Sequence, residues 1–305
     1  MAKYFVTGAS GFIGSSLVKD LVSHGHKVLG LARSDASAAK VEANGGEVVR
    51  GELTDLGILK KAAGASDGVI HLGFIHDFSN MPHSLEVDLK AMHAISEVLE
   101  GTGKPLVYTQ ALLGIAAPPG QPARDETFRS LEIPQWAIGR ASNEAFVLGL
   151  KDKGIRSMSV RLPPTVHGKD DRAFVSFLIN RAKAKGFAGY PGEGNNIWPS
   201  AHKDDVATLY RLAVEKGEAN SVFHAIAEFV PTKKLAEFIG KNLAVDVKSV
   251  PEDQFADYFG FLSRLIAINS TTTSKITKKT LGWDPKGKSL EEDILTTYRA
   301  TTSMF

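Results

Sequence analysis

The sequence predicts an α/β protein with a doubly wound parallel sheet and a smaller C-terminal lobe. Apolar, β-branched runs alternate with amphipathic helical patterns from residue 3 to about residue 162. Strands and helices that alternate in this way form a parallel sheet with helices on both faces, joined by right-handed crossovers. A turn with three glycines follows the first run directly, and the alternation loosens after Leu162.

The strands and helices of the sheet domain follow from these two periodicities. The strands are expected at Lys3–Thr7, Lys27–Ala32, Glu47–Arg50, Asp67–Gly73, Pro105–Gln110 and Arg156–Leu162. The helices between them are expected at Ser15–His24, Asp55–Ala63, Ser84–Glu100 and Gln135–Lys151.

The rest of the chain predicts a lobe of mixed structure. Turn chemistry interrupts the pattern at Pro163-Pro164, Gly186–Gly194 and Asn195–Ser200. Helices are expected at Phe174–Lys185, Lys203–Glu215, Thr232–Asn242 and Glu252–Ile266, short strands at Ser221–Ala225 and Asp246–Val250, and a polar surface loop at Ser270–Ser274. We therefore predict a sheet domain over residues 1–165 and a smaller lobe over residues 166–305, with some segments of the latter returning to the sheet domain.

The glycine turn that follows the first strand reads Thr7-Gly8-Ala9-Ser10-Gly11-Phe12-Ile13-Gly14. Strand, glycine turn and helix in this order are the context of a dinucleotide-binding (Rossmann) fingerprint. Gly8 permits the tight turn, Gly11 lets a pyrophosphate approach the backbone, and Gly14 lets the helix pack on its strand. The expected cofactor contacts of this turn are Gly8, Ser10, Gly11, Phe12, Ile13 and Gly14. An ordinary turn of another α/β protein is the alternative.

Composition excludes several classes of function. The net charge of +2 comes from 36 basic and 34 acidic residues without a long run of one sign, which does not suggest a nucleic-acid or membrane partner. There is no cysteine, so thiol nucleophiles, thiolate metal sites and disulfides are excluded. The histidines are too irregularly spaced to predict a metal site. The first strand leaves no room for a signal peptide, so a cytoplasmic enzyme is expected.

Several motifs together resemble the extended or atypical branch of the short-chain dehydrogenase/reductase superfamily, of the NAD-dependent epimerase/dehydratase type. They are Thr7–Gly14, Gly51-Glu52-Leu53-Thr54-Asp55, His71-Leu72-Gly73, Arg161–Gly168 and His202–Ala207. The resemblance covers nearly the whole chain. It implies a Rossmann fold with a substrate-binding C-terminal lobe.

The resemblance also implies which residues contact the cofactor. Glu52, with Leu53, falls where relatives hold the adenine, and Leu72 and Gly73 fall beside the ribose and phosphates. The stretch with Pro163, Thr165 and Val166 is similar to the one that runs past the nicotinamide.

The choice of cofactor depends on the end of the second strand. Proteins that prefer NAD usually place a carboxylate there to bind the ribose 2′-hydroxyl. This chain has Leu31-Ala32-Arg33-Ser34, with no acid before Asp35. Arg33 would pair with a 2′-phosphate by a charge-assisted bond, and Ser34 would donate another. The sequence therefore favours NADP(H) over NAD(H); the alternative leaves Arg33 in solvent and Asp35 capping a helix.

The catalytic residues of the family are replaced here. Relatives use Ser with Tyr and Lys, the last two lying four residues apart on one helix face. Trp136 stands where Tyr is expected and Arg140 where Lys is expected, and the serine position reads Ala111. Trp cannot exchange a proton near neutral pH, and Arg140 stays charged, so it would bind the nicotinamide ribose or orient substrate.

Other side chains would then complete the site. Thr109 or Gln110 would hold a carbonyl oxygen, and a proton would come from His167, His76, Tyr190, Tyr108 or water. Histidine is the natural candidate because its pKa lies near neutrality. The alternative for each is structural: the histidines as loop residues with a backbone bond, Tyr108 as core, and Tyr190 as a turn or pocket-lining residue.

These observations predict an NADP(H)-dependent oxidoreductase that acts on a carbonyl or alcohol of a small organic molecule. Two rivals stay open: a redox-neutral epimerase, isomerase or lyase that keeps the cofactor bound, and a non-catalytic nucleotide-binding sensor. A homodimer through the helices at Ser84–Glu100 and Gln135–Lys151 is a further expectation from the resemblance.

Overall fold

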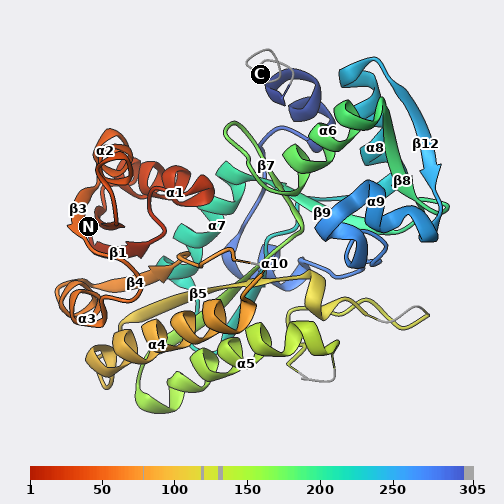
Figure 1. Ribbon diagram of the computed structural model, residues 1–305. Helices are drawn as coiled ribbons and strands as arrows, with labels where there is room; N and C mark the ends of the chain where they lie inside the picture. Colours follow the sequence, from red (N-terminus) through yellow and green to blue (C-terminus); the bar gives the residue numbers. More distant parts are fainter. Residues whose placement is uncertain (78, 118–119, 130–132, 299–305) are drawn as a thin grey trace.

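The computed structural model describes residues 1–77, 79–117, 120–129 and 133–298 and is built around a seven-stranded parallel sheet (Figure 1). The strand order β10-β6-β5-β4-β1-β2-β3 is doubly wound, which confirms the predicted class. The strands are β1 (Lys3–Thr7), β2 (Lys27–Ala32), β3 (Glu47–Arg50), β4 (Gly68–His71), β5 (Pro105–Ala111), β6 (Arg156–Leu162) and β10 (Ser221–His224).

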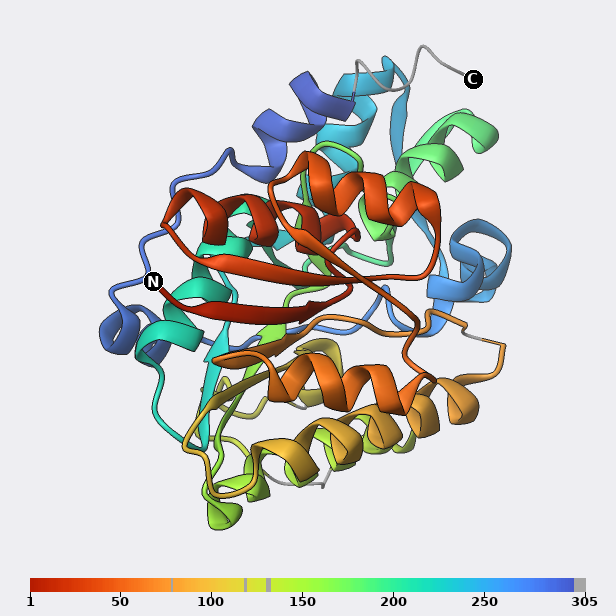
Figure 2. The ribbon, with the colours of Figure 1, turned by 90° about the vertical axis from the view of Figure 1, so that its left-hand side faces the viewer.

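Helices cover both faces of this sheet (Figure 2). One face carries α1 (Phe12–Ser23), α2 (Asp35–Ala43), α7 (Lys203–Lys216) and α10 (Lys275–Leu281). The other carries α3 (Leu56–Gly64), α4 (Met81–Leu99) and α5 (Gln135–Gly149). Short 3-10 turns follow β5 and α5, at Leu113–Ile115 and Leu150–Lys153.

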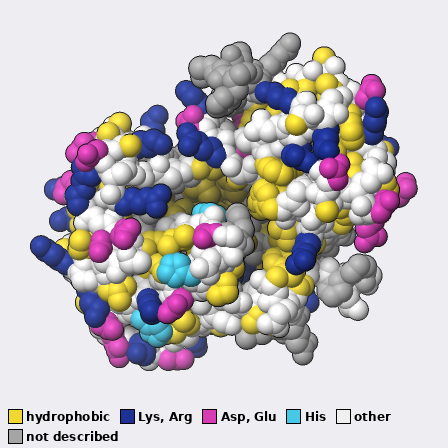
Figure 3. All heavy atoms as spheres, in the orientation of Figure 1, with side chains coloured by type: hydrophobic (Ala, Val, Ile, Leu, Met, Phe, Trp, Pro, Cys, Tyr) yellow, Lys and Arg dark blue, Asp and Glu magenta, His cyan; other side chains and the backbone are white. Residues whose placement is uncertain are grey.

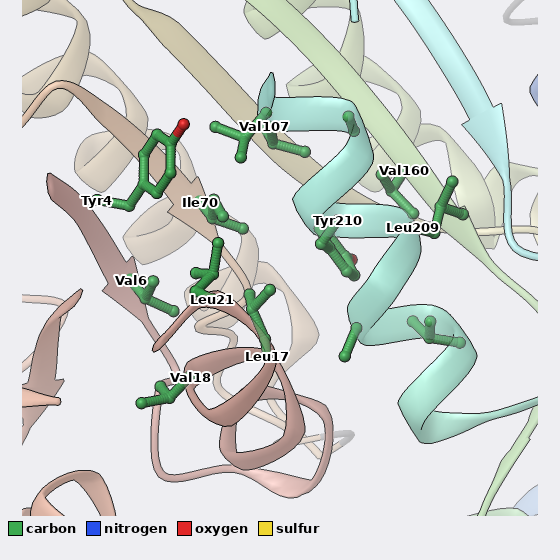
Figure 4. Close-up of a cluster of buried hydrophobic side chains, with 14 of the residues drawn as sticks. Tyr4, Val6, Leu17, Val18, Leu21, Ile70, Val107, Val160, Leu209 and Tyr210 are labelled. Atoms are coloured by element: carbon green, nitrogen blue, oxygen red, sulfur yellow. The ribbon is translucent and has the colours of Figure 1, made fainter. Parts of the chain in front are cut away.

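Helix α7 and strand β10 come from the C-terminal half of the chain but belong to the main sheet and its layers. Leu17 and Leu21 on α1 pack with Leu209 and Tyr210 on α7 in one core cluster (Figure 4). Strand β10 adds a parallel edge strand beside β6. The main sheet and its helix layers are therefore completed by residues from the C-terminal half of the chain.

The smaller lobe holds two further sheets and their helices. The sheets have the orders β11-β9-β7 and β12-β8, with β7 (Thr165–His167), β8 (Phe187–Pro191), β9 (Ile197–His202), β11 (Glu228–Pro231) and β12 (Asp246–Val250). The helices are α6 (Phe174–Lys185), α8 (Thr232–Leu243), α9 (Phe255–Phe259) and α11 (Leu290–Asp293), with 3-10 turns at Glu252–Gln254 and Gly260–Arg264 and a π turn at Ile294–Tyr298. They share a separate apolar core.

Three expectations for this lobe were wrong. Strands β8 and β9 lie where glycines and prolines predicted only turns, because both pair with strands that are distant in sequence. The stretch Ser270–Ser274 is not a surface loop: Ser270 is fully buried and its amide donates to the Ile197 carbonyl. The helix expected over Glu252–Ile266 breaks at Gly260, whose φ of +53° ends α9.

Across the described ranges, no helix combines the length and the apolar character that crossing a bilayer requires.

Candidate active site

The glycine turn forms a tight cradle at the carboxyl end of β1. Gly8 has a φ of +68°, and a Cβ there would lie 2.9 Å from the amide nitrogen of Gly73, at the end of β4. A Cβ on Gly14 would lie 2.0 Å from the Gly8 carbonyl oxygen, so α1 touches the turn directly. Helix α1 has no side-chain cap and no acid in its first turn. Its first amides are therefore available to an anion, and the cradle fits the pyrophosphate of a dinucleotide.

The opposite end of the predicted cofactor site lies at β2 and β3. Arg33 is exposed at the end of β2, and within the described chain it has no hydrogen bond or ion pair. Ser34 caps α2 by accepting from the Ser37 amide at 3.2 Å. Asp35 pairs with Arg50 at 2.6 Å instead of capping the helix.

Glu52 lies beyond β3 and is exposed there, accepting from the Thr54 hydroxyl at 2.8 Å. Leu53 is half-buried and packs against the loop after β4. Its Cδ2 lies 3.0 Å from the position that a Cβ on Gly73 would take. The contact of Glu52 and Leu53 with an adenine stays a prediction.

A buried chain of hydrogen bonds runs from the glycine cradle into the sheet. The Gly73 amide donates to the Thr7 hydroxyl at 3.0 Å, and that hydroxyl lies 2.9 Å from Nδ1 of His71. Nε2 of His71 lies 3.2 Å from Oδ1 of Asp88, on α4. The three contacts join the Gly73 amide, the Thr7 hydroxyl, the His71 ring and the Asp88 carboxylate into one chain, in which Nε2 of His71 donates to Asp88.

Asp88 is the centre of this buried chain. Its second oxygen accepts from the Tyr108 hydroxyl at 2.6 Å and from the Asn143 amide at 2.8 Å. Burial acts against ionisation, but the hydrogen bonds and charges around the carboxylate hold the pKa of Asp88 below its usual value. Burial raises the pKa of Tyr108 well above its usual value, so this tyrosine keeps its proton. The bonds tie the loop after β4 to α4, β5 and α5.

Arg140 joins α5 to the carboxyl end of β5. Its Nη2 donates to the Thr109 carbonyl at 2.6 Å and its Nε donates to Oε1 of Gln110 at 3.2 Å. The guanidinium lies over the Phe74 ring, 4.2 Å from the centroid. Among the described residues, two of its five donors are used by the protein, so further donors are left for a ribose or substrate oxygen.

Thr109 and Gln110 are anchored inside the protein. The Thr109 hydroxyl donates to the His71 carbonyl at 2.7 Å and accepts from the Tyr210 hydroxyl at 2.7 Å. Oε1 of Gln110 accepts from the Ala111 amide as well as from Arg140. Their predicted contact with a substrate oxygen stays a prediction; this geometry favours a role in fixing Arg140.

Trp136 and His76 lie near Arg140 at the mouth of the site. Trp136, in the first turn of α5, leaves half of its side chain exposed. The His76 ring stands edge-on to the Phe74 ring, with centroids 5.4 Å apart. Partial desolvation and the Arg140 charge lower the pKa of His76 below its usual value. The structure therefore brings Trp136, Arg140 and His76 to the same edge of the sheet.

The predicted nicotinamide stretch leads into the lobe. Pro163 and Val166 are buried, and the Thr165 hydroxyl donates to the Pro199 carbonyl at 2.6 Å. His167 is fully buried, with Nδ1 2.9 Å from Oδ2 of Asp293, on α11. This ring is thus held within the lobe by Asp293.

A hollow lies between the two halves of the molecule. Figure 3 shows this hollow between the half with α1, α3 and α4 and the half with α8, α9 and β12, with hydrophobic side chains gathered on its walls.

Reasoning from the sequence missed the Thr7–His71–Asp88 chain. One signal was present: Asp88 lies at an apolar position of α4, between Val87 and Ala91 on the buried face.

The comparisons with known proteins agree with this architecture. The family model described as NAD dependent epimerase/dehydratase family matches residues 4–226. An uncharacterised protein of Saccharomyces cerevisiae is 45% identical over 299 residues, which cover 97% of this chain and 99% of that protein. The 4-hydroxy-2-methyl-3-oxo-4-farnesyl-3,4-dihydroquinoline-1-oxide ketoreductase of Stigmatella aurantiaca is 27% identical over 224 residues, covering 72% of this chain and 66% of that protein.

Among solved structures, the UDP-glucose 4-epimerase of Thermotoga maritima with UDP-glucose has a TM-score of 0.79 at 19% identity, covering 99% of this chain and 100% of that one. This likeness shows the shared fold. The family match spans the glycine cradle, Arg140 and the stretch that leads into the lobe. The chain therefore belongs to the NAD-dependent epimerase/dehydratase family.

Proposed function

We propose that this protein is an NADPH-dependent reductase of a carbonyl group on a small organic molecule. The observation that carries the proposal is Arg140, which is fixed by Thr109 and Gln110 at the same sheet edge as the glycine cradle. Its bonds to the part of the chain that the structure describes leave donors available. The family match and the similarity to a ketoreductase support the reaction class. The exposed Arg33, with no acid at the end of β2, supports the cofactor choice.

In this proposal each group of the site has one task. A nicotinamide dinucleotide held at the glycine cradle would supply the hydride for the carbonyl carbon. Arg140 donates a hydrogen bond to the carbonyl oxygen or to the ribose, and its fixed geometry needs little reorganisation. His76 gives the oxygen its proton, so that hydride plus proton convert the carbonyl to an alcohol. Tyr108 is buried on Asp88, and His167 is bound to Asp293, which makes His76 the histidine best placed for this step.

Changing Arg33→Met is expected to weaken NADPH binding by about 10- to 100-fold, because the variant loses a hydrogen bond to a charged phosphate. NADH binding should stay unchanged, since NADH has no 2′-phosphate. Fluorescence titration of the purified protein with each nucleotide measures this. The matched control is Lys40→Met, an exposed cation on α2. Equal losses for both nucleotides, or none, would contradict a 2′-phosphate contact at Arg33.

The reduction rate is expected to fall as pH rises through the pKa of His76, which lies below its usual value. The reason is that the protonated ring is the donor, and the protonated fraction decreases above the pKa. His76→Gln should lower kcat by about 100-fold or more and remove this limb of the pH profile. His83→Gln, an exposed histidine on α4, is the control. An unchanged profile for His76→Gln would assign the proton to another group.

The first experiment on the wild-type protein combines nucleotide binding with turnover. NADPH consumption over a panel of ketones and aldehydes supports the proposal. The replacement of the family's Tyr and Lys by Trp136 and Arg140 favours one second candidate, a redox-neutral enzyme that retains its cofactor. Conversion of substrate without net NADPH consumption would support that candidate instead, and tight binding without turnover would support a nucleotide sensor.

A further inference from the structure

Trp136 has no task in the proposed reaction, although it stands next to the reacting groups. It lies one helical turn before Arg140 on α5, so the two side chains project from the same face of the helix. Half of the indole is exposed, whereas the other two tryptophans of the chain, Trp198 and Trp283, are buried. An indole that stays open at the mouth of the site is a surface on which a ligand can bind.

The position of this indole is fixed by the backbone beside it. Ala137, the next residue, packs closely on Gly114, where a Cβ would lie 2.6 Å from the Ala137 Cβ. The Cη2 atom of Trp136 lies 3.9 Å from the same position, so an edge of the indole rests on the 3-10 turn Leu113–Ile115. Leu113 belongs to the apolar core of the lobe. The turn that supports the indole is therefore anchored in the lobe, and the ring lies at the junction of the two halves.

Other aromatic rings gather around this junction. The Phe74 ring covers the Arg140 guanidinium, with 4.2 Å between the ring centroid and the guanidinium carbon, and the His76 ring stands edge-on to Phe74. On the side of the lobe, Phe174 and Phe177 of α6 pack against the apolar core. Figure 3 shows hydrophobic side chains on the walls of the hollow. Aromatic surface therefore borders the group that would hold the carbonyl oxygen.

This arrangement suits a flat ring better than a saturated one. Aromatic rings pack on one another in offset or edge-to-face contacts, which add to the gain from burying apolar area. Arg140 attracts the face of a substrate ring as it attracts the face of Phe74. A saturated ring of the same size gains the burial but neither of these two contacts.

We propose that Trp136 is a specificity-determining residue that stacks on the aromatic ring of an aryl ketone or aryl aldehyde, the substrate class of this reductase. The inference rests on the proposed carbonyl reduction and adds the chemistry of the substrate body to it. One helical turn, about 5.4 Å, separates Trp136 from Arg140, so a ring on the indole brings its attached carbonyl oxygen toward the guanidinium. The position that relatives use for proton transfer becomes a binding surface here.

The test compares two ketones of matched size, acetophenone and cyclohexyl methyl ketone, with NADPH as the reductant. For Trp136→Leu we expect kcat/KM to fall about 10-fold on acetophenone and less than about 3-fold on cyclohexyl methyl ketone, because leucine is apolar but has no ring. The fall should appear in KM, with kcat nearly unchanged. Trp136→Phe keeps a ring and should stay within about 3-fold of the wild type on both ketones. Each variant is compared with the wild type on the same ketone, which removes the difference in reactivity between the two ketones.

The matched control is Phe146→Leu, which removes an aromatic ring from the same helix. Phe146 lies about 15 Å further along the axis of α5, and its ring contacts His93 on α4. This variant should reduce both ketones as the wild type does. Thermal unfolding should confirm that each variant is folded.

A second measurement needs no turnover. Because Trp198 and Trp283 are buried, Trp136 is the tryptophan that a ligand in the site can touch. Titration with acetophenone should quench the tryptophan fluorescence of the wild type to a plateau, as binding does, and not in the linear way of random collisions. In Trp136→Leu the plateau should be absent.

The outcomes separate this inference from the proposed function. If the wild type consumes NADPH and Trp136→Leu loses equally on both ketones, or loses nothing, the inference is overturned and the proposed function stands. Reduction of aliphatic carbonyls without any reduction of acetophenone would have the same meaning. If no ketone or aldehyde is reduced, the proposed function fails, and the fluorescence titration decides whether Trp136 binds the ring.

Discussion

Replacing Glu144 with alanine is expected to lower the free energy of unfolding by about 3–5 kcal/mol, because it leaves a buried guanidinium without its counterion. Glu144 on α5 and Arg161 on β6 are both almost fully buried. Arg161 donates from Nε to Oε1 at 2.8 Å and from Nη2 to Oε2 at 2.7 Å, and the Ser159 hydroxyl donates to Oε1 at 2.6 Å. Urea unfolding measures the change.

The groups that remain around Arg161 cannot replace the carboxylate. They are the Phe128 carbonyl, which accepts at 3.0 Å, and Nε2 of His224 at 3.4 Å. Burial and the Arg161 charge lower the pKa of His224 to about 3, so this ring is neutral. Its Nδ1 donates to the Thr273 carbonyl at 2.7 Å, which leaves Nε2 as an acceptor toward Arg161.

Two further variants make the Glu144 prediction specific. Glu86→Ala removes an exposed carboxylate that pairs with Lys90 on α4, and no change in the unfolding midpoint is expected. The double variant Glu144→Met with Arg161→Met should recover most of the loss, because two apolar side chains fill the space without an unpaired charge. If Glu144→Ala were as stable as the wild type, the prediction would be contradicted, and water would have to reach the Arg161 guanidinium.

Changing Gly14→Ala is expected to weaken dinucleotide binding by about 100-fold or more, equivalent to about 2.7 kcal/mol. The added methyl would lie 2.0 Å from the Gly8 carbonyl oxygen and 2.9 Å from its carbon, and backbone atoms at the turn cannot move aside without opening the cradle. Fluorescence titration with NADPH measures the loss, and urea unfolding separates it from a loss of fold.

The control for Gly14 is another helical glycine. Gly57, in the first turn of α3, has open space around its missing side chain, so Gly57→Ala should keep both binding and stability. Wild-type affinity in Gly14→Ala would mean that the turn is not the phosphate site.

The sheet domain could be predicted from the sequence because its signals are local. Strands β1 to β6 are short apolar runs, and the glycine turn is contiguous. The lobe depends on distant partners: β8 pairs with β12 and β9 with β11, so their glycines and prolines concealed strands that tertiary pairing stabilises. Ser270–Ser274 looked exposed because its residues are polar, whereas the Ser274 hydroxyl donates to the buried Ile226 carbonyl.

The candidate site also has a part that could be predicted from local sequence motifs and a part that could not. The cradle and Arg140 were predicted from motifs that lie within a few residues of one another. The burial of His167 against Asp293 joins residues 126 positions apart, and the Thr7–His71–Asp88 chain joins β1, β4 and α4. No local sequence pattern predicts such contacts. The homodimer through α4 and α5 stays a prediction.

The pairing of α1 with α7 also has a consequence for biosynthesis. The two helices are joined by Ser16 with Asp204 and by an ion pair of Asp20 with Arg211 at 2.7 Å, besides their apolar contacts. A chain leaves the ribosome from its N-terminus, so the α1 face that carries Leu17 and Leu21 stays uncovered until α7 has emerged. The nascent sheet half must therefore wait, partly folded, for α7, and during this interval chaperones have an apolar surface to bind.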